Sequence, residues 1–236
     1  MNPYEKKYTI DIHDVDFNGV ARTSALMRYL QSTAQSQLTD NNLSYDKMRS
    51  MNRALIISKI KMEFTEPVRT YEPVTAVTFP CDSRGYTLLR CYKLVRDGVT
   101  IGRAVSAWAL VNTEDRSLVK INDFDFNLKT YDPLDLPLNR IVIPKETETV
   151  GYYTVNYDEI DQNRHMNNTK YPDIYANFLP LSGKRIQSIT IGYTSEATFG
   201  EVLTVERAFV DGIYYFRTRH SDGRENSVAE IKLCNI

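Results

Sequence analysis

Cysteine and histidine are both scarce in this chain of 236 residues, with three of each. The cysteines, Cys81, Cys91 and Cys234, are odd in number and include no Cys-x-x-Cys pair. This argues against a disulfide framework and against a thiolate zinc site. No His-Glu-x-x-His motif is present either, so a classical zinc enzyme is not expected. We therefore expect reduced thiols, no metal and no cofactor.

The chain also has little net charge and no long apolar run. Lys plus Arg number 29 and Asp plus Glu 30, giving a net charge of −1, so no overall basic field attracts nucleic acid. No segment approaches the roughly 18 apolar residues of a membrane-spanning helix, and residues 1–10 lack the apolar core of a secretory signal. With 42% hydrophobic residues, the chain is expected to be a globular cytoplasmic protein without membrane insertion.

The sequence contains an internal repeat. Residues 8–29 and 153–175 both open with Tyr, Thr and an aliphatic residue. A constant offset of 145 positions aligns three notable pairs: Asp16 with Asp161, Asn18 with Asn163, and Val20 with His165. Few identities support the alignment, and two copies are too few for a solenoid.

Both copies predict the same order of elements, β-α-β-β-β-β. Hydrophobic periodicity and Asp-Gly turn signals in the first half predict a strand, a helix with Thr23 or Ser24 as its cap, and four strands, at residues 7–13, 23–39, 55–64, 74–81, 86–96 and 100–111. The second half predicts the same elements at residues 152–158, 168–179, 186–193, 202–210, 213–219 and 227–233. The order indicates an α+β fold in which each half wraps an antiparallel sheet around a central helix.

The organisation predicted from this repeat is an N-terminal domain over residues 1–121 and a C-terminal domain over residues 150–236. The segment 122–149 between them contains three prolines and no clear period, and is expected to be a linker across the surface. Each half needs a partner to cover its second face, so the halves should pack as one unit. The alternative is two unrelated α+β domains joined by that linker.

The densest polar stretch, residues 161–168, lies between a predicted strand and a predicted helix. Near a helix N-terminus, His165 is expected to be a neutral base or hydrogen-bond partner. The simpler interpretation of Asn167 or Asn168 is that one of them caps the predicted helix. Glu196 follows the next strand, and Glu66 is taken as its counterpart in the first half. Because the first half has no matching histidine, one working site in the second half is predicted.

These residues resemble those of the acyl-acyl carrier protein thioesterase family, of the bacterial type related to plant plastid enzymes. The family pattern Asp-x-Asn-x-His-x-Asn-Asn-x-x-Tyr is matched by Asp161, Asn163, His165, Asn167, Asn168 and Tyr171. The family's catalytic glutamate is matched by Glu196. A cysteine that follows it in the plant enzymes is Ala197 here, which excludes a cysteine nucleophile at that position. The resemblance covers about residues 5–235 and implies a double hotdog, while the lack of a plastid transit peptide implies a bacterial cytoplasmic protein.

The resemblance implies hydrolysis of fatty acyl-acyl carrier protein to free fatty acid and carrier protein, which terminates fatty acid synthesis. No Gly-x-Ser-x-Gly elbow is present, so attack by water is the preferred route. His165 or Glu196 would be the base, Asn163 and a backbone N–H would polarise the carbonyl, and Asp161 would orient the site. A covalent route through Asp161 or Glu196 stays open.

The resemblance also places the acyl chain in the first half, where the candidate lining residues are Leu26, Met27, Leu30, Ala34, Ile56, Trp108 and Leu110. Acidic carrier protein would need a basic patch, with candidates Lys59, Lys61, Arg69, Lys170, Lys184 and Arg185. An acyl-CoA thioesterase, a hotdog hydratase and a non-catalytic acyl-binding hotdog protein are the alternatives, and both monomer and homodimer remain open.

Overall fold

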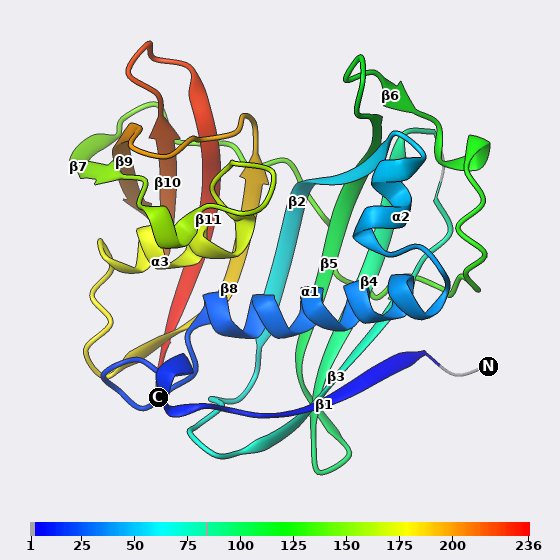
Figure 1. The fold of residues 1–236 in the computed structure, drawn as a ribbon. Coiled ribbons are helices and arrows are strands. Elements are labelled where there is room, and N and C mark those ends of the chain that lie inside the picture. The colour runs from blue at the N-terminus through cyan, green and yellow to red at the C-terminus, as the bar shows by residue number, and fades with distance from the viewer. Residues whose placement is uncertain (1–2, 84) are drawn as a thin grey trace.

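The computed structural model describes residues 3–83 and 85–236, whose strands form one antiparallel sheet (Figure 1). The first half contains β1 (Tyr4–Thr9), α1 (Thr23–Asp40), α2 (Tyr45–Ser50), β2 (Arg53–Phe64), β3 (Pro73–Pro80), β4 (Thr87–Arg96), β5 (Val99–Asn112) and β6 (Leu118–Val119). The second contains β7 (Glu148–Thr154), α3 (Tyr171–Ala176), β8 (Lys184–Tyr193), β9 (Val202–Val210), β10 (Ile213–Arg219) and β11 (Glu225–Asn235). The predicted element order is present in both halves, with α2 and β6 as additions.

The order of the strands shows how the halves are related. It runs β1-β3-β4-β5-β2-β8-β11-β10-β9-β7. Counted outwards from the centre, β2-β5-β4-β3-β1 of the first half corresponds to β8-β11-β10-β9-β7 of the second. The halves meet where residues 59–63 of β2 pair with residues 188–192 of β8. The prediction that they pack as one unit is confirmed.

The helix α1 crosses the sheet of the first half, and α3 lies over that of the second (Figure 1). The buried face of α1 includes the apolar residues that recur at helical spacing in the sequence, Leu26, Met27, Leu30, Ala34 and Leu38. The predicted cap is wrong, because Arg22 is the N-cap and Thr23 and Ser24 lie inside the buried first turn. Ser24 Oγ instead donates to Asp173 Oδ1 at 2.7 Å, which ties α1 to α3.

The second helix is shorter than its periodicity predicts. A 3-10 turn at Asn168–Lys170 precedes α3, which is six residues long and carries Pro172 in its first turn. The first strand of each half starts and ends earlier than predicted. It ends at Thr9 or Thr154, because the apolar residues that follow belong to loops that pack inward. Among the described residues, no helix is long and apolar enough to cross a membrane.

The core is shared by the two halves, since one buried cluster contains residues of both helices and of β2 and β8. The segment between the halves lies against the outer face of the first sheet, where Leu136 packs with Phe79, Cys81 and Val105. A second small cluster joins α2 to β5, with Leu110 at its centre.

Candidate active site

The loop between β7 and α3 is built around Asp161. One oxygen of its carboxylate, Oδ1, accepts hydrogen bonds from the backbone N–H of Asn163 at 2.8 Å and of His165 at 3.4 Å. The Asp161 N–H donates to the His165 carbonyl at 2.9 Å, and Arg164 adopts a positive φ of 66° at the tip. This closed turn fixes the direction in which His165 leaves the backbone.

The imidazole of His165 faces the carboxylate of Glu196. Its Nε2 atom lies 3.2 Å from Glu196 Oε2, and the two side chains are 26% and 44% exposed. The segment after β8 that carries Glu196 is held against the Asp161 loop, because Met166 N–H donates to the Ala197 carbonyl at 2.8 Å and His165 forms a β-bridge with Thr198. The His165 and Glu196 side chains, 31 positions apart in the sequence, thus lie close enough together for one water molecule to contact both.

The side chain of Asn163 is oriented from the first half. Tyr45 of α2 donates its hydroxyl hydrogen to Asn163 Oδ1 at 2.7 Å, which turns the Nδ2 group toward Asp161 Oδ2 at 3.3 Å. An amide nitrogen carries two hydrogens, so one remains for a ligand. Asp161, Asn163, His165 and Glu196 all line one cleft of about 740 Å³, and the structure therefore brings the four predicted residues together.

The two asparagines that follow His165 have separate tasks. Asn167 is the cap, since its Oδ1 accepts from Thr169 N–H at 2.9 Å. Asn168 lines the cleft, and its position is set by Gln31 Nε2, which donates to its Oδ1 at 2.7 Å, and by Tyr193, which donates to its carbonyl at 2.9 Å. Tyr171 also lines the cleft; burial raises its pKa to about 12, so it is neutral near pH 7.

A hydrogen-bonded group of three residues beside the site carries no sequence motif. Ser195, which lines the cleft, has its Oγ 2.6 Å from His220 Nε2, and His220 Nδ1 pairs with Glu201. The serine lies in a Tyr-Thr-Ser-Glu segment and not on a nucleophile elbow, so no motif marks it. Its Oγ also lies 2.8 Å from the Glu225 carbonyl, and this second contact makes it a fixed part of the Glu196 segment.

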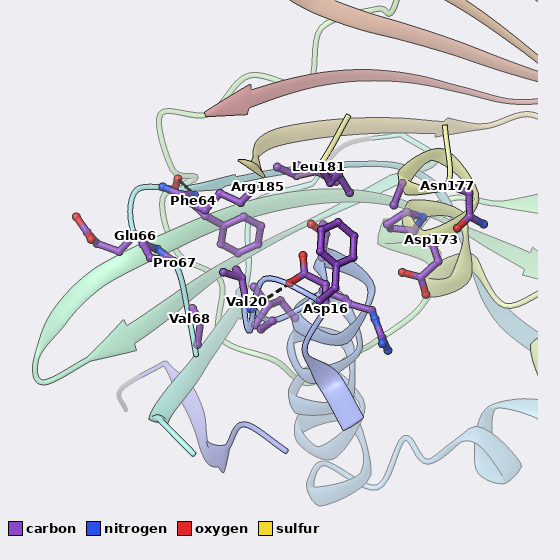
Figure 2. Close-up of a pocket in the computed structure, with 18 residues that line it drawn as sticks. Asp16, Val20, Phe64, Glu66, Pro67, Val68, Asp173, Asn177, Leu181 and Arg185 are labelled. Carbon is purple, nitrogen blue, oxygen red and sulfur yellow. Dashed lines mark hydrogen bonds between the residues drawn. The ribbon is translucent and has the colours of Figure 1, made fainter. Parts of the chain in front are cut away.

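The first half has a pocket of about 560 Å³ at the corresponding place (Figure 2). Asp16 closes the same turn as Asp161, accepting from Asn18 N–H at 2.8 Å and Val20 N–H at 3.1 Å. Asn18 is committed to structure, because its Nδ2 donates to the Leu181 carbonyl at 2.7 Å. Val20 takes the place of His165 and is buried, so this turn has no base.

The pairing of Glu66 with Glu196 is wrong by one residue. Ala21 N–H bonds to the Val68 carbonyl as Met166 N–H bonds to the Ala197 carbonyl, so Val68 corresponds to Ala197. Pro67 therefore corresponds to Glu196, and Glu66 to Ser195. In Figure 2 the Glu66 carboxylate points away from Asp16 and Val20. In the first half, Val20 and Pro67 thus stand at the positions of His165 and Glu196.

The residues predicted to line the acyl slot are distributed over several places. Ala34 and Trp108 line a cavity of about 270 Å³ between α1 and the first sheet, and Ile56 lines the cleft that holds His165 and Glu196. Leu26 lines the pocket of about 560 Å³ in the first half. Met27, Leu30 and Leu110 are fully buried in packed clusters.

The residues predicted to form a basic patch are mostly engaged elsewhere. Arg185 is buried and donates to the Phe64 and Thr65 carbonyls at 3.1 and 2.9 Å, so its assignment to a surface patch is wrong. Lys61 pairs with Glu63, and Lys170 with Asp158. Three other exposed arginines line the cleft, Arg49, Arg116 and Arg224, of which Arg224 also pairs with Asp222 at 2.7 Å. Within residues 3–83 and 85–236, no three His, Cys, Asp or Glu side chains gather in a way that could hold a metal.

The fold has close structural relatives. An acyl-ACP thioesterase from Bacteroides thetaiotaomicron superimposes with a TM-score of 0.90 at 20% identity, covering 98% of this chain and 97% of the other. The 12:0-ACP thioesterase from Umbellularia californica gives a TM-score of 0.81 at 17% identity, covering 99% and 97%. Together with the two repeated units around α1 and α3, this likeness defines a double hotdog protein of the α+β class.

Family models and curated relatives place the chain more narrowly. The model of the acyl-ACP thioesterase N-terminal domain matches residues 1–126, and that of the C-terminal domain matches residues 143–233. The oleoyl-acyl carrier protein thioesterase 1 of Arabidopsis thaliana is 24% identical over 252 residues, and the alignment covers 95% of this chain and 69% of that protein. The palmitoyl-acyl carrier protein thioesterase of the same plant is 24% identical over 221 residues, but only 53% of its length is covered. The chain belongs to the acyl-ACP thioesterase family, whose members are thioester hydrolases.

Proposed function

We propose that this protein hydrolyses fatty acyl-acyl carrier protein to free fatty acid and carrier protein, at the cleft that holds His165 and Glu196. The observation that carries the proposal is the 3.2 Å contact between these two side chains, beside an asparagine with a free amide hydrogen. Family membership supports the reaction class.

Water is the nucleophile in the proposed mechanism. It attacks the thioester carbonyl carbon while its proton passes to the His165–Glu196 pair, and the carbonyl oxygen gains the negative charge. The carbon–sulfur bond then breaks, and the leaving thiolate takes up a proton. Asn163 Nδ2–H donates to the carbonyl oxygen, an interaction that strengthens as charge develops and whose loss typically costs about 10²–10³ in rate. Asp161 keeps Asn163 and His165 in place through its backbone hydrogen bonds.

The carrier would approach from the rim where Arg49, Arg116 and Arg224 are exposed. These three side chains come from α2, from the loop after β5 and from the turn before β11, and they surround a cleft that also contains the catalytic residues. Carrier proteins are acidic and their prosthetic arm carries a phosphate, so an arginine rim would attract and orient them. Coenzyme A carries phosphates too, and an acyl-CoA thioesterase remains the second candidate on this observation.

The test is hydrolysis of acyl-carrier protein and acyl-CoA thioesters from octanoyl to stearoyl. Wild type is compared with His165→Ala and Glu196→Gln, each checked for folding by thermal melt. Fast turnover of carrier thioesters that falls by about 10²–10⁴ in both folded variants is the expected result. Glu66→Gln is the matched control, since that carboxylate lies at the other pocket and should leave turnover unchanged. A folded wild type that hydrolyses no thioester would overturn the proposal and bring acyl binding without catalysis forward.

A further inference from the structure

The side-chain amide of Asn168 is held in a way that leaves its nitrogen uncommitted. Its Oδ1 accepts a hydrogen bond from Gln31 Nε2 on α1 at 2.7 Å. This bond turns Oδ1 toward α1 and Nδ2 away from it, because the two atoms lie on opposite branches of one planar amide. In the part of the chain that the structure describes, Nδ2 donates to no protein acceptor. Asn168 is half-buried and lines the cleft that holds His165 and Glu196, so both Nδ2 hydrogens are available to a ligand in that cleft.

Asn168 is connected to both segments that carry the His165–Glu196 pair. It follows His165 by three positions, in the loop whose turn is closed by the Asp161 carboxylate. Its backbone carbonyl accepts a hydrogen bond from the Tyr193 hydroxyl at 2.9 Å. Tyr193 is the last residue of β8 and precedes Glu196 by three positions. The position of Asn168 is therefore fixed relative to the histidine and to the glutamate.

The proposed reaction calls for a second donor to the thioester carbonyl oxygen. That oxygen carries a negative charge in the tetrahedral intermediate, and sites that stabilise such an oxyanion commonly present two donors. Asn163 can supply one hydrogen, because its other amide hydrogen faces Asp161 Oδ2 at 3.3 Å. The nearby Ser195 hydroxyl is engaged within the protein, by His220 Nε2 at 2.6 Å and by the Glu225 carbonyl at 2.8 Å. An uncommitted amide nitrogen in the same cleft meets the requirement.

We propose that Asn168 Nδ2 is the second hydrogen-bond donor to the thioester carbonyl oxygen, and that Gln31 turns the amide so that it can donate. The donor acts as water adds to the carbonyl carbon, when the carbon–oxygen double bond becomes a single bond and the oxygen takes the negative charge. The amide keeps its proton, and its hydrogen bond strengthens with that charge. Asn168 is thus a catalytic residue and Gln31 a positioning residue. This inference rests on the proposed thioesterase function.

Asn168→Asp tests the donor, with Asn167→Asp as the matched control. In Asn168→Asp the carboxylate still accepts from Gln31 and the backbone N–H of residue 168 stays in place, so the donor that is lost is the side-chain amide. Asn167→Asp adds the same charge one residue away, and its carboxylate still caps the Thr169 N–H. On an acyl-carrier protein thioester, kcat should fall by about 10²–10³ in folded Asn168→Asp, with KM within about threefold of wild type. In Asn167→Asp both constants should stay within about threefold.

Gln31→Glu tests the same donor from a residue that does not line the cleft. Gln31 lies on α1 and lines the cavity of about 270 Å³ instead. A glutamate there only accepts hydrogen bonds, so Asn168 should turn its amide to donate to it and present Oδ1 to the thioester. Although Asn168 is intact, kcat should fall by about tenfold or more. Gln35→Glu is the matched control, because Gln35 follows one turn later on α1, is exposed and lines the same cavity.

The outcomes separate this inference from the proposed function. If wild type is active and folded Asn168→Asp turns over as fast as Asn167→Asp, the thioesterase function stands and the inference is overturned. A raised KM with unchanged kcat also overturns it, because the amide would then hold the carrier's arm and not the reacting carbonyl. If wild type hydrolyses no thioester, the proposed function fails and the inference fails with it. If a thermal melt shows that Asn168→Asp does not fold, turnover in Gln31→Glu equal to that in Gln35→Glu would overturn the inference.

Discussion

Nε2 of His220 lies 2.6 Å from Oγ of Ser195, the residue immediately before Glu196. The other ring nitrogen pairs with Glu201. In the first half Arg96 makes the equivalent link, since it bonds to Glu72 and to the Pro67 carbonyl. Both halves therefore tie the segment after β2 or β8 to the end of another strand, and in the second half this link holds the segment that bears Glu196.

We predict that His220 is a positioning residue for Glu196. Breaking its contact with Ser195 should let the Glu196 segment move relative to His165, so His220→Leu should lower kcat by about ten- to a hundredfold with little change in KM. The pH dependence of kcat should change too, because the carboxylate would no longer face the imidazole. The matched control is Arg96→Leu, which breaks the corresponding link in the half without a base. It should lower the melting temperature without a change in the pH profile, and an equal change in both variants would contradict the prediction.

The contact between His220 and Glu201 makes the stability of the fold depend on pH. Burial tends to raise the pKa of Glu201, but hydrogen bonds from His220 and Thr198 outweigh it, so the net pKa lies below the ordinary value of 4.5. A carboxylate with a lowered pKa in the folded state stabilises the fold above 4.5, and this contribution is lost as the pH falls through the folded pKa. The free energy of unfolding of the wild type, measured with urea, should therefore decrease as the pH falls over that range. Glu201→Gln should be less stable near neutral pH and show a flatter acid limb; an identical acid limb would argue against the contact.

The sequence predicted the fold well where burial determined the pattern. The strands at residues 202–210 and 213–219 were predicted to the residue, because alternating burial and an Asp-Gly turn leave little freedom in their register. The helix over residues 168–179 was predicted too long, since Phe178 and Leu179 continue its apolar face although they lie in a loop. Local periodicity cannot distinguish a helix from a loop that packs on the same core.

The site was predicted in part for a related reason. Asp161, Asn163 and His165 share one loop, so sequence proximity placed them together. Glu66 was paired with Glu196 because both follow a central strand, and only the backbone hydrogen bonds around Val68 and Ala197 show the shift by one residue. Tyr45 escaped notice, because its partner Asn163 is 118 residues away and no local pattern marks such a contact.

The two Asp turns provide a controlled comparison of structure and catalysis. Asp16 and Asp161 accept the same backbone hydrogen bonds, so Asp16→Ala and Asp161→Ala should each lose about 1–2 kcal/mol of folding free energy. Only Asp161→Ala should also lower turnover, by about tenfold or more, because its turn positions His165 and Asn163. Chemical denaturation and thioester hydrolysis on the same preparations check both parts. A comparable fall in turnover for Asp16→Ala would show that the first half takes part in catalysis.

The contact between Tyr45 and Asn163 joins the two halves beside the cleft that holds His165 and Glu196. Since the tyrosine hydroxyl occupies Asn163 Oδ1, it determines which end of the amide faces the substrate. In Tyr45→Phe the amide is free to rotate and can present its oxygen to the thioester carbonyl, which would repel the developing charge. We expect kcat to fall by about three- to tenfold, the effect of one ordinary hydrogen bond, with a smaller change in KM. Tyr4→Phe is the matched control, because Tyr4 donates to Asp40 at 2.6 Å on the surface, and Asp40 lies outside the cleft that Asn163 lines. If Tyr45→Phe loses no more activity than Tyr4→Phe, Asn163 does not depend on this contact and the role assigned to its Nδ2 group loses its structural basis.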